Sequence, residues 1–372
     1  MMKYVSEPYR MFFPVGVLFL LVGSLLWLPQ LWNPSDYPVL LHRFCMLGGF
    51  TSFFIAGFLM TAVPKFSQTR SASVTEVILF LMATLPGIWG GIILDERLVL
   101  ISSILQPLML LIFLATRIFK RKANPPFTFV FIPVGLLLWI ASGVLSLVWD
   151  PENFKNLHYE GAISAIILGV GSRLLPGILG HTEIVSTQRQ LYERPLPLIK
   201  TIPTSFLILV MIFTASYFID HPITFMIRAL IVTHIAFSYW RLHKLPKDKT
   251  ALTFGLWVCG HMIMLSFILR AVWDEGGIHA SHAFFISGIV LLSLLIATRV
   301  LQSHGPQDKN LERSRLLYVV LGMIVLAALT RVSAYLMPET YQNHLAYSGG
   351  ILGLAVLLWS GKYLKNVLVF SK

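Results

Sequence analysis

The chain has 372 residues, of which 56% are hydrophobic and 12% are charged, and its mean hydropathy is +0.74. The charged fraction is about half that of an ordinary soluble domain, which excludes a soluble fold of this size. The net charge is +12, but the Lys and Arg residues stand in short clusters between apolar runs. That pattern indicates membrane topology and excludes a nucleic-acid interface.

Apolar runs of about 20 residues predict an all-α transmembrane bundle of about twelve spans. The first run, from Phe12 to Leu28, is interpreted as a span and not as a cleaved signal peptide, because no small-residue cleavage site follows it. The first six spans are expected near 12–28, 39–63, 74–94, 98–119, 127–149 and 157–179. The other six are expected near 198–219, 222–243, 251–273, 279–302, 315–337 and 341–368.

The connections between these spans alternate in charge. One side collects most basic residues, from Lys3 and Arg10 at the start, through the cluster at 117–122, to Lys372 at the end. The other side is mainly acidic, with Arg97 and Lys155 as its basic exceptions. Positive loops stay in the cytoplasm, so both termini are expected there. No hydrophilic stretch is long enough for another domain, and residues 1–372 are interpreted as a single integral membrane domain surrounded by the lipid bilayer.

Polar side chains within spans are costly and suggest function. Six histidines lie at or near the starts of even-numbered spans, which the charge pattern places toward the outer face: His42, His158, His221, His279, His282 and His344. His261 differs, because it lies near the middle of the ninth span. Imidazole is a common axial ligand of haem iron, and clustered histidines would also serve copper. A histidine at a span boundary is also common as an interfacial residue, which is the alternative for each site.

Four arginines share this outer layer. Arg43 is adjacent to His42, Arg228 lies seven residues after His221 and so on the same helical face, and Arg270 and Arg331 come late in spans nine and eleven. Arginine stays charged at any pH and suits haem propionates, so Arg43 and Arg228 are the expected partners. Arg270 and Arg331 can instead extend to the outer headgroups. The two cysteines, Cys45 and Cys259, lie in apolar segments and are not expected to form a disulfide.

The opposite ends of three spans show a second pattern. Span two ends with Thr61 to Lys65, span six with Gly171 to His181, and span ten with Thr298, Arg299, His304 and Gly305. These spans lie four apart in order, each begins near a histidine, and each ends in a small, polar or basic break. Weak internal repetition of four-helix units would explain this, and so would convergence on helix-end chemistry.

Several segments together resemble the NnrS family of bacterial membrane proteins. HRFCMLGGFTSFFIAGFLMTAVPKFSQTR, from His42 to Arg70, is similar to the family pattern H-A-H-E-M-x-F-G-F followed by A-G-F-L-x-T-A-V-P. GSRLLPG at 171–177 resembles a Gly-Arg-x-x-Pro segment, and HAFFISGIVLLSLLIATRVLQSHG from His282 resembles a stretch with His, Gly, T-R-V and G-H-T-G-R. EPYRMFFP at 7–14 resembles the short F-R-P-F-F lead.

The sequence also departs from the family pattern. His42 matches the first family histidine, but Phe44 and Cys45 stand where the second histidine and the glutamate are expected. The L-H-x-G-Y of the ninth span is replaced, with Val258 and His261 at its His and Tyr positions. His42, His282 and His304 carry over, although His304 falls on the cytoplasmic side.

The resemblance implies a haem protein, of b type, in the bacterial inner membrane, with copper as a further metal. It implies resistance to nitric oxide and nitrosative stress in cells that make or meet nitrogen oxides, as in denitrification. The chain would bind nitric oxide, turn it over as a haem-dependent oxidoreductase, or exchange electrons with a redox partner. His42 and His282 are the first candidates for metal ligands. His158, His221 and His344 follow for haem, and His279 and His261 for a metal ion.

Two other interpretations remain at this point. Twelve spans with both termini inside is also a common transporter layout, and buried Arg and His could bind an anion or relay protons for a small solute. Two observations argue against a transporter: Gly and Pro interruptions in matched central positions are few, and no carboxylate is expected deep in a span. The other interpretation is a structural membrane subunit without a cofactor.

Overall fold

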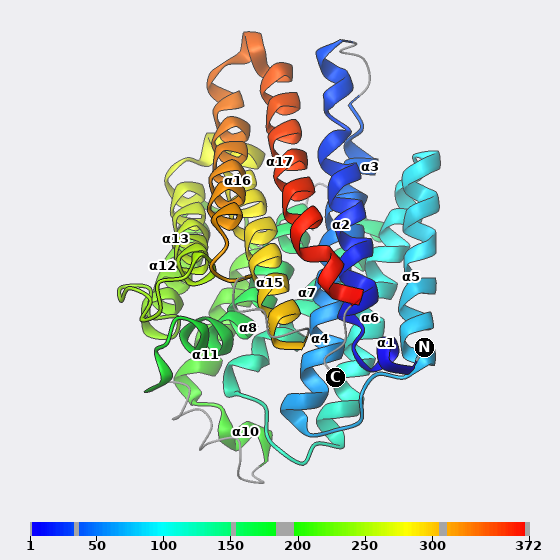
Figure 1. The fold of residues 1–372 in the computed structure, drawn as a ribbon, viewed down its shortest axis with the longest axis vertical. Helices are drawn as coiled ribbons and strands as arrows, with labels where there is room; N and C mark the ends of the chain where they lie inside the picture. The colour runs from blue at the N-terminus through cyan, green and yellow to red at the C-terminus, as the bar shows by residue number, and fades with distance from the viewer. Residues whose placement is uncertain (1, 33–36, 150–153, 184–196, 305–310, 369–372) are drawn as a thin grey trace.

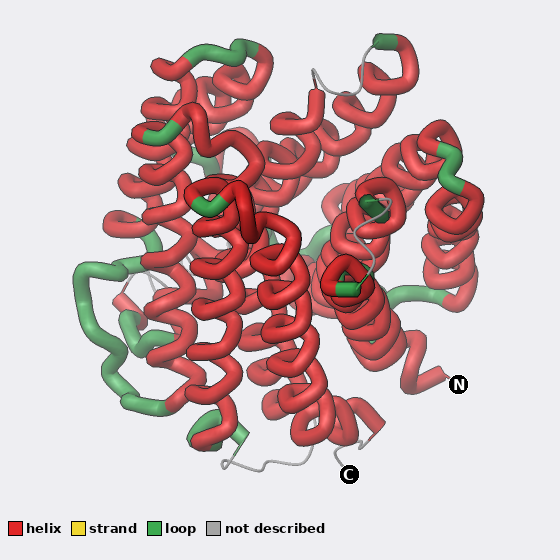
Figure 2. Tube along the Cα trace, turned by 90° about the horizontal axis from the view of Figure 1, so that it is seen from above, coloured by secondary structure: helices red, strands yellow, loops and turns green. Residues whose placement is uncertain are grey.

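The structure is a computed structural model that describes residues 2–32, 37–149, 154–183, 197–304 and 311–368. These residues form helices, turns and loops, with no strand among them, and Figure 2 shows the helices from above. The predicted all-α class is therefore confirmed. The two cysteines are both buried and free.

Ten helical segments are long and apolar enough to cross a membrane, and each coincides with a predicted span. They are Tyr9–Leu31, Val39–Ser67, Val74–Ile93, Glu96–Phe119, Phe127–Val148, Leu157–Ile178, Ala251–Val272, Gly277–Ser303, Arg315–Leu336 and Pro338–Val367. Two shorter apolar helices, Thr204–Phe218 and Pro222–Ser238, lie where spans seven and eight are expected. A multi-pass membrane protein follows from these helices, while the count of twelve spans stays a prediction.

The main α-helices follow the chain in three groups of four (Figure 1). The first group is α2 (Tyr9–Leu25), α4 (Ser52–Ser67), α5 (Val74–Ile93) and α6 (Glu96–Phe119). The second is α7 (Phe131–Val148), α8 (Ile163–Ile178), α11 (Thr204–Ala215) and α12 (Pro222–Ser238). The third is α13 (Ala251–Val272), α15 (Leu291–His304), α16 (Arg315–Ser333) and α17 (Tyr341–Tyr363).

These groups close into a bundle. Helix α6 packs on α7, α12 packs on α13, and α17 returns to pack on α2, so the last group contacts the first. The chain ends also meet, because Nη1 of Arg10 donates to the carbonyl of Val367 over 2.6 Å. The short helix α1 (Met2–Ser6) and the C-terminal end of α17 lie toward the same end of the bundle in Figure 1. Both ends of the described chain therefore lie on one side, as an even number of spans requires, while the cytoplasmic assignment stays a prediction.

The second helix of each group is central. The spans that contain α4, α8 and α15 have 72%, 67% and 67% of their most apolar stretch buried, against 33% to 56% for the other seven long segments. Helices that are apolar all round and buried belong to the interior of a bundle. Features carried by α4, α8 and α15 are therefore the ones placed at the centre of the protein.

Each central span contains a π-helical segment near the end that carries its histidine. The segments are η2 (Phe44–Thr51) after α3 (Val39–Arg43), η5 (Leu157–Ala162) before α8, and η8 (Ala283–Val290) after α14 (Gly277–His282). π-Helices are rare and frequently mark functional sites, because the extra residue in a turn shifts which side chains face inward. Their recurrence in spans two, six and ten is a second regularity beside the histidines, and internal repetition itself stays a prediction.

Candidate functional site

His42 ends the short helix α3 and is held by α2. Its Nδ1 lies 2.8 Å from the carbonyl oxygen of Gly23, and the indole of Trp27 lies against the imidazole with ring centroids 5.2 Å apart. The indole N–H of Trp27 also points at Nδ1, over 3.1 Å. A carbonyl only accepts and an indole N–H only donates, and the shorter contact, to Gly23, favours the tautomer with the proton on Nδ1 and the lone pair on Nε2. A fixed tautomer of this kind is how proteins orient a histidine toward a metal.

His282 repeats this arrangement on the third central span. Its Nδ1 lies 2.7 Å from the carbonyl oxygen of Ile278, one turn earlier in α14. No described residue forms a hydrogen bond with Nε2 of His42 or of His282, and both rings are only partly buried. Two imidazoles, 240 positions apart in the chain, thus present the same nitrogen as a potential ligand.

The structure brings these two histidines together around Arg331. The guanidinium of Arg331 acts electrostatically on both rings, and His42 and His282 also act on each other. Arg331 lies in the last turn of α16 and is only 9% exposed, so it does not extend to the outer headgroups as the sequence allowed. A buried guanidinium that acts on both histidines supplies a fixed positive charge for an anionic ligand.

His279 and His282 share a helix but differ in role. Nη1 of Arg331 lies 2.8 Å from Nδ1 of His279. Because a guanidinium only donates, this contact uses the Nδ1 lone pair and puts the imidazole proton on Nε2. The rings of Tyr335 and Tyr341 also lie against His279. The Nδ1 atom of His279 is therefore used by Arg331, whereas that of His282 contacts a main-chain carbonyl.

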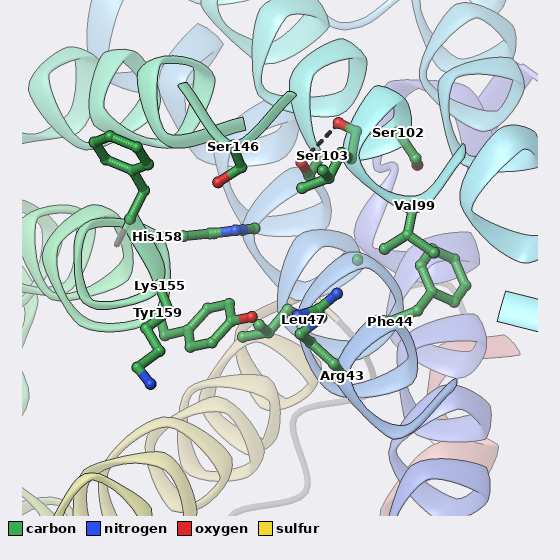
Figure 3. Close-up of a pocket in the computed structure, with 13 residues that line it drawn as sticks. Arg43, Phe44, Leu47, Val99, Ser102, Ser103, Ser146, Lys155, His158 and Tyr159 are labelled. Atoms are coloured by element: carbon green, nitrogen blue, oxygen red, sulfur yellow. Dashed lines mark hydrogen bonds between the residues drawn. The ribbon is translucent and has the colours of Figure 1, made fainter. Parts of the chain in front are cut away.

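His158 belongs to a separate pocket. Its ring projects from η5 toward Arg43, with Tyr159 and Ser146 beside it (Figure 3). The cavity has a volume of about 30 Å³, which is enough for one or two water-sized molecules and hence for a diatomic gas. Nε2 of His158 is buried and has no hydrogen-bond partner among the described residues. Arg43 forms an ion pair with Glu96 and a hydrogen bond with Tyr159, so its charge is already balanced.

The remaining predicted histidines lie elsewhere. His221 is exposed and caps α12, accepting a hydrogen bond from the Ile223 N–H over 3.2 Å. His344 lies 3.2 Å from both the Thr330 carbonyl and the Ser333 hydroxyl. His261 in α13 packs on Trp257, with ring centroids 4.2 Å apart and Nδ1 2.9 Å from the Trp257 carbonyl. His304 ends α15, far along the span from His282.

Arg228 is held by its own hairpin. Its guanidinium donates to the carbonyl and the hydroxyl of Ser216 and lies over the rings of Tyr217 and Phe225, at 4.0 and 4.6 Å. Every one of these partners belongs to the segment 216–228. Arg228 is buried, as predicted, but these contacts join η6 (Ser216–Phe218) to α12 and give it a structural role.

Two buried residues of the site were missed by the sequence analysis. Glu160 in η5 is 4% exposed and accepts a hydrogen bond from the hydroxyl of Ser281 in α14. Glu160 lies five residues after the basic Lys155, so it resembles a boundary residue in the sequence. Its burial places a carboxylate inside the bundle near the start of its span. Its position directly after His158 and Tyr159 was the available signal.

The donor set bears on which metal group fits. In the described part of the chain, no three His, Cys, Asp or Glu side chains converge on one point. A copper centre usually takes three or more such ligands, so the described residues do not supply one. Haem needs at most two protein ligands, and His42 with His282 and the adjacent Arg331 fit that requirement.

The sequence model of the NnrS protein family matches residues 3–369, nearly the whole chain. The chain belongs to the NnrS family. No curated protein matches it. Membership of the NnrS family fits a membrane protein connected with nitric oxide stress. The family resemblance predicted from His42 to Arg70 and from His282 onward is therefore confirmed.

Proposed function

We propose that this NnrS-family protein binds a b-type haem between His42 and His282 and uses it to protect the cell from nitric oxide. The observation that supports the proposal is the matched pair of imidazoles, each with Nδ1 bonded to a main-chain carbonyl and with Nε2 available. Arg331 would balance the propionates, in place of Arg43 and Arg228, which have other partners.

Haem supplies one-electron chemistry and a site for small gases. The residues of this chain supply orientation and charge. Gly23 and Ile278 orient the two rings through their carbonyls, Trp27 packs against His42, and Arg331 contributes a buried positive charge. His42 and His282 would hold the haem, which would then supply a site for nitric oxide or exchange electrons with a redox partner. The pocket beside His158 is of a size to admit nitric oxide itself.

The location follows the same proposal. We place the protein in the cytoplasmic membrane of bacteria, with the basic loops and both termini inside. His42 and His282 then lie toward the outer face.

The test is a visible spectrum with pyridine haemochrome analysis of the purified protein. The wild type is expected to show a Soret band that shifts on reduction and on addition of nitric oxide. His42→Ala and His282→Ala should each lose most of the haem. His221→Ala is the matched control, because that histidine is exposed and caps a helix, and it should retain haem. A wild type without a Soret band, or a double His42→Ala, His282→Ala variant with a normal one, would contradict the proposal.

A proton-coupled transporter is the second candidate, and Glu160 favours it. A buried carboxylate inside a span is typical of proton relays, and Glu160 is buried beside Ser281. Solute uptake by cofactor-free proteoliposomes, abolished by Glu160→Gln, would favour this function over the haem proposal.

A further inference from the structure

The C-terminal ends of the three central helices, α4, α8 and α15, line a second, larger cavity. Its volume is about 450 Å³, within the range of small-molecule sites. It lies at the end of α4, α8 and α15 opposite to the histidines, the end toward which these helices run in Figure 1. None of the candidate haem ligands lines it. What it holds is therefore a separate question from the haem proposal.

Each central helix contributes one basic residue to the lining. These are Lys65 of α4, Arg173 of α8 and Arg299 of α15. Glu312 forms an ion pair with Arg299, and Glu7, paired with Arg10 over 2.6 Å, acts electrostatically on Lys65. The lining thus gathers one cationic side chain from each of the three central helices.

The rest of the cavity is mostly apolar. Phe58, Leu174 and Ile296, again one from each helix, form part of its lining. The same three residues also line a smaller apolar cavity of about 90 Å³ between the same helices. The two cavities are therefore neighbours, with a basic region at the end of the bundle and an apolar region in its interior. This arrangement suits a ligand with a charged end and an apolar end.

We propose that this cavity binds an amphipathic organic anion. Its carboxylate or phosphate group would lie among Lys65, Arg173 and Arg299, where charge-assisted hydrogen bonds are strongest. Its apolar part would lie against Phe58, Leu174 and Ile296. A small inorganic ion would leave most of the 450 Å³ unfilled. The ligand can come from the inner aqueous phase or from an anionic lipid, since both present the same chemistry.

The experiment uses the full-length protein in nanodiscs of neutral phosphatidylcholine, with hexyl phosphate as the probe and calorimetry as the measurement. Saturable binding is expected, weakened by added salt. Butyl phosphate, which is two methylenes shorter, should bind about fifteenfold more weakly, because each buried methylene contributes roughly 0.8 kcal/mol, or about fourfold. Arg173→Gln and Arg299→Gln should each weaken hexyl phosphate binding by about tenfold or more.

Three variants serve as controls. Arg173→Lys keeps the charge and should restore part of the affinity. Arg315→Gln removes an exposed basic residue of α16 outside the cavity and should leave binding unchanged. Glu312→Gln removes the carboxylate that competes for Arg299 and should tighten binding. Glu312→Gln and Arg299→Gln should change the affinity for hexyl phosphate in opposite directions, which a general loss of folding would not do. Thermal unfolding of each variant checks independently that it is folded.

Nanodiscs that also contain phosphatidylglycerol distinguish the two sources. If phosphatidylglycerol competes with hexyl phosphate in the wild type but not in Arg173→Gln, the cavity binds a lipid headgroup. If phosphatidylglycerol does not compete in the wild type, the cavity binds a soluble anion. The proposal is overturned if hexyl phosphate does not bind saturably, or if its affinity is the same in Arg173→Gln, Arg299→Gln and Arg315→Gln.

Discussion

The hydroxyl of Ser281 donates a hydrogen bond to the carboxylate of Glu160, and both side chains are buried. This bond joins two of the three central spans at the level of the candidate haem ligands. Ser281 directly precedes His282, and Glu160 follows His158 by two residues. This hydrogen bond therefore links the regions around His158 and His282 in the interior of the bundle.

Ser281→Ala should lower the free energy of unfolding by about 1–3 kcal/mol, because the buried Glu160 carboxylate loses a donor. Chemical unfolding in detergent, followed by tryptophan fluorescence, measures this. Thr330→Ala is the control, since that hydroxyl bonds the Leu326 carbonyl within its own helix, and its effect should stay within about 0.5 kcal/mol. Equal stability of Ser281→Ala and wild type would show that the contact does not hold the two spans together.

The two buried arginines allow the proposed propionate partner to be tested. Arg331→Gln should change the reduction potential of the bound haem, because it removes a fixed positive charge that acts on His42 and His282. Arg228→Gln should leave the potential unchanged and lower stability by about 1–3 kcal/mol, because it leaves the carbonyl of Ser216 without its donor. Redox titration and thermal unfolding of the two variants measure both effects. A larger potential shift in Arg228→Gln than in Arg331→Gln would reverse the assignment.

The sequence predicted the helices well because lipid imposes simple rules. Each span must be long and apolar, and basic loops stay on one side. The seventh span was predicted from residue 198, but α11 starts at Thr204, directly after Pro203. The eighth starts at Pro222 as predicted, but α12 ends at Ser238, before the predicted residue 243. Proline has no N–H to donate and favours the first turn of a helix, so it shortens a span that hydropathy alone would extend.

The site was harder to predict than the fold. The sequence pattern placed His42 and His282 in one layer, and in the structure the same arginine acts on both; their role as ligands stays a prediction. The sequence could not show which arginine lies near these histidines. Arg43, Arg228 and Arg331 differ in the tertiary neighbours that balance their charges, and only the structure shows those neighbours. The π-helices were not predicted either, since hydrophobic periodicity does not distinguish one wide turn from a regular one.

Close packing between the first and last spans can be tested at a glycine. A Cβ on Gly349 of α17 would lie 2.3 Å from the carbonyl oxygen of Ser24 in α2, and a main-chain atom cannot rotate away. Gly349→Ala should therefore destabilise the protein by about 1–3 kcal/mol. Gly322 of α16 has nothing within 4 Å of that position, so Gly322→Ala should stabilise its helix by about 0.5–1 kcal/mol. Thermal unfolding that shows the same sign for both variants would contradict this account of the α2 and α17 contact.

The last prediction concerns pH and His181, which lies beyond the end of α8. Burial, followed by the charges of Lys244 and Lys247, lowers the pKa of His181 below its usual value of 6.5, although the nearby Glu183 opposes this. The unfolded chain then binds a proton more readily than the folded protein. His181 thus contributes stability that is present above pH 6.5 and is lost as the pH falls through its folded pKa. The melting temperature should therefore fall between pH 7.5 and pH 5.5, and His181→Gln should reduce that difference. His243→Gln, which removes an exposed histidine, should leave the difference as in the wild type. An unchanged pH dependence in His181→Gln would show that this buried imidazole does not couple protonation to folding.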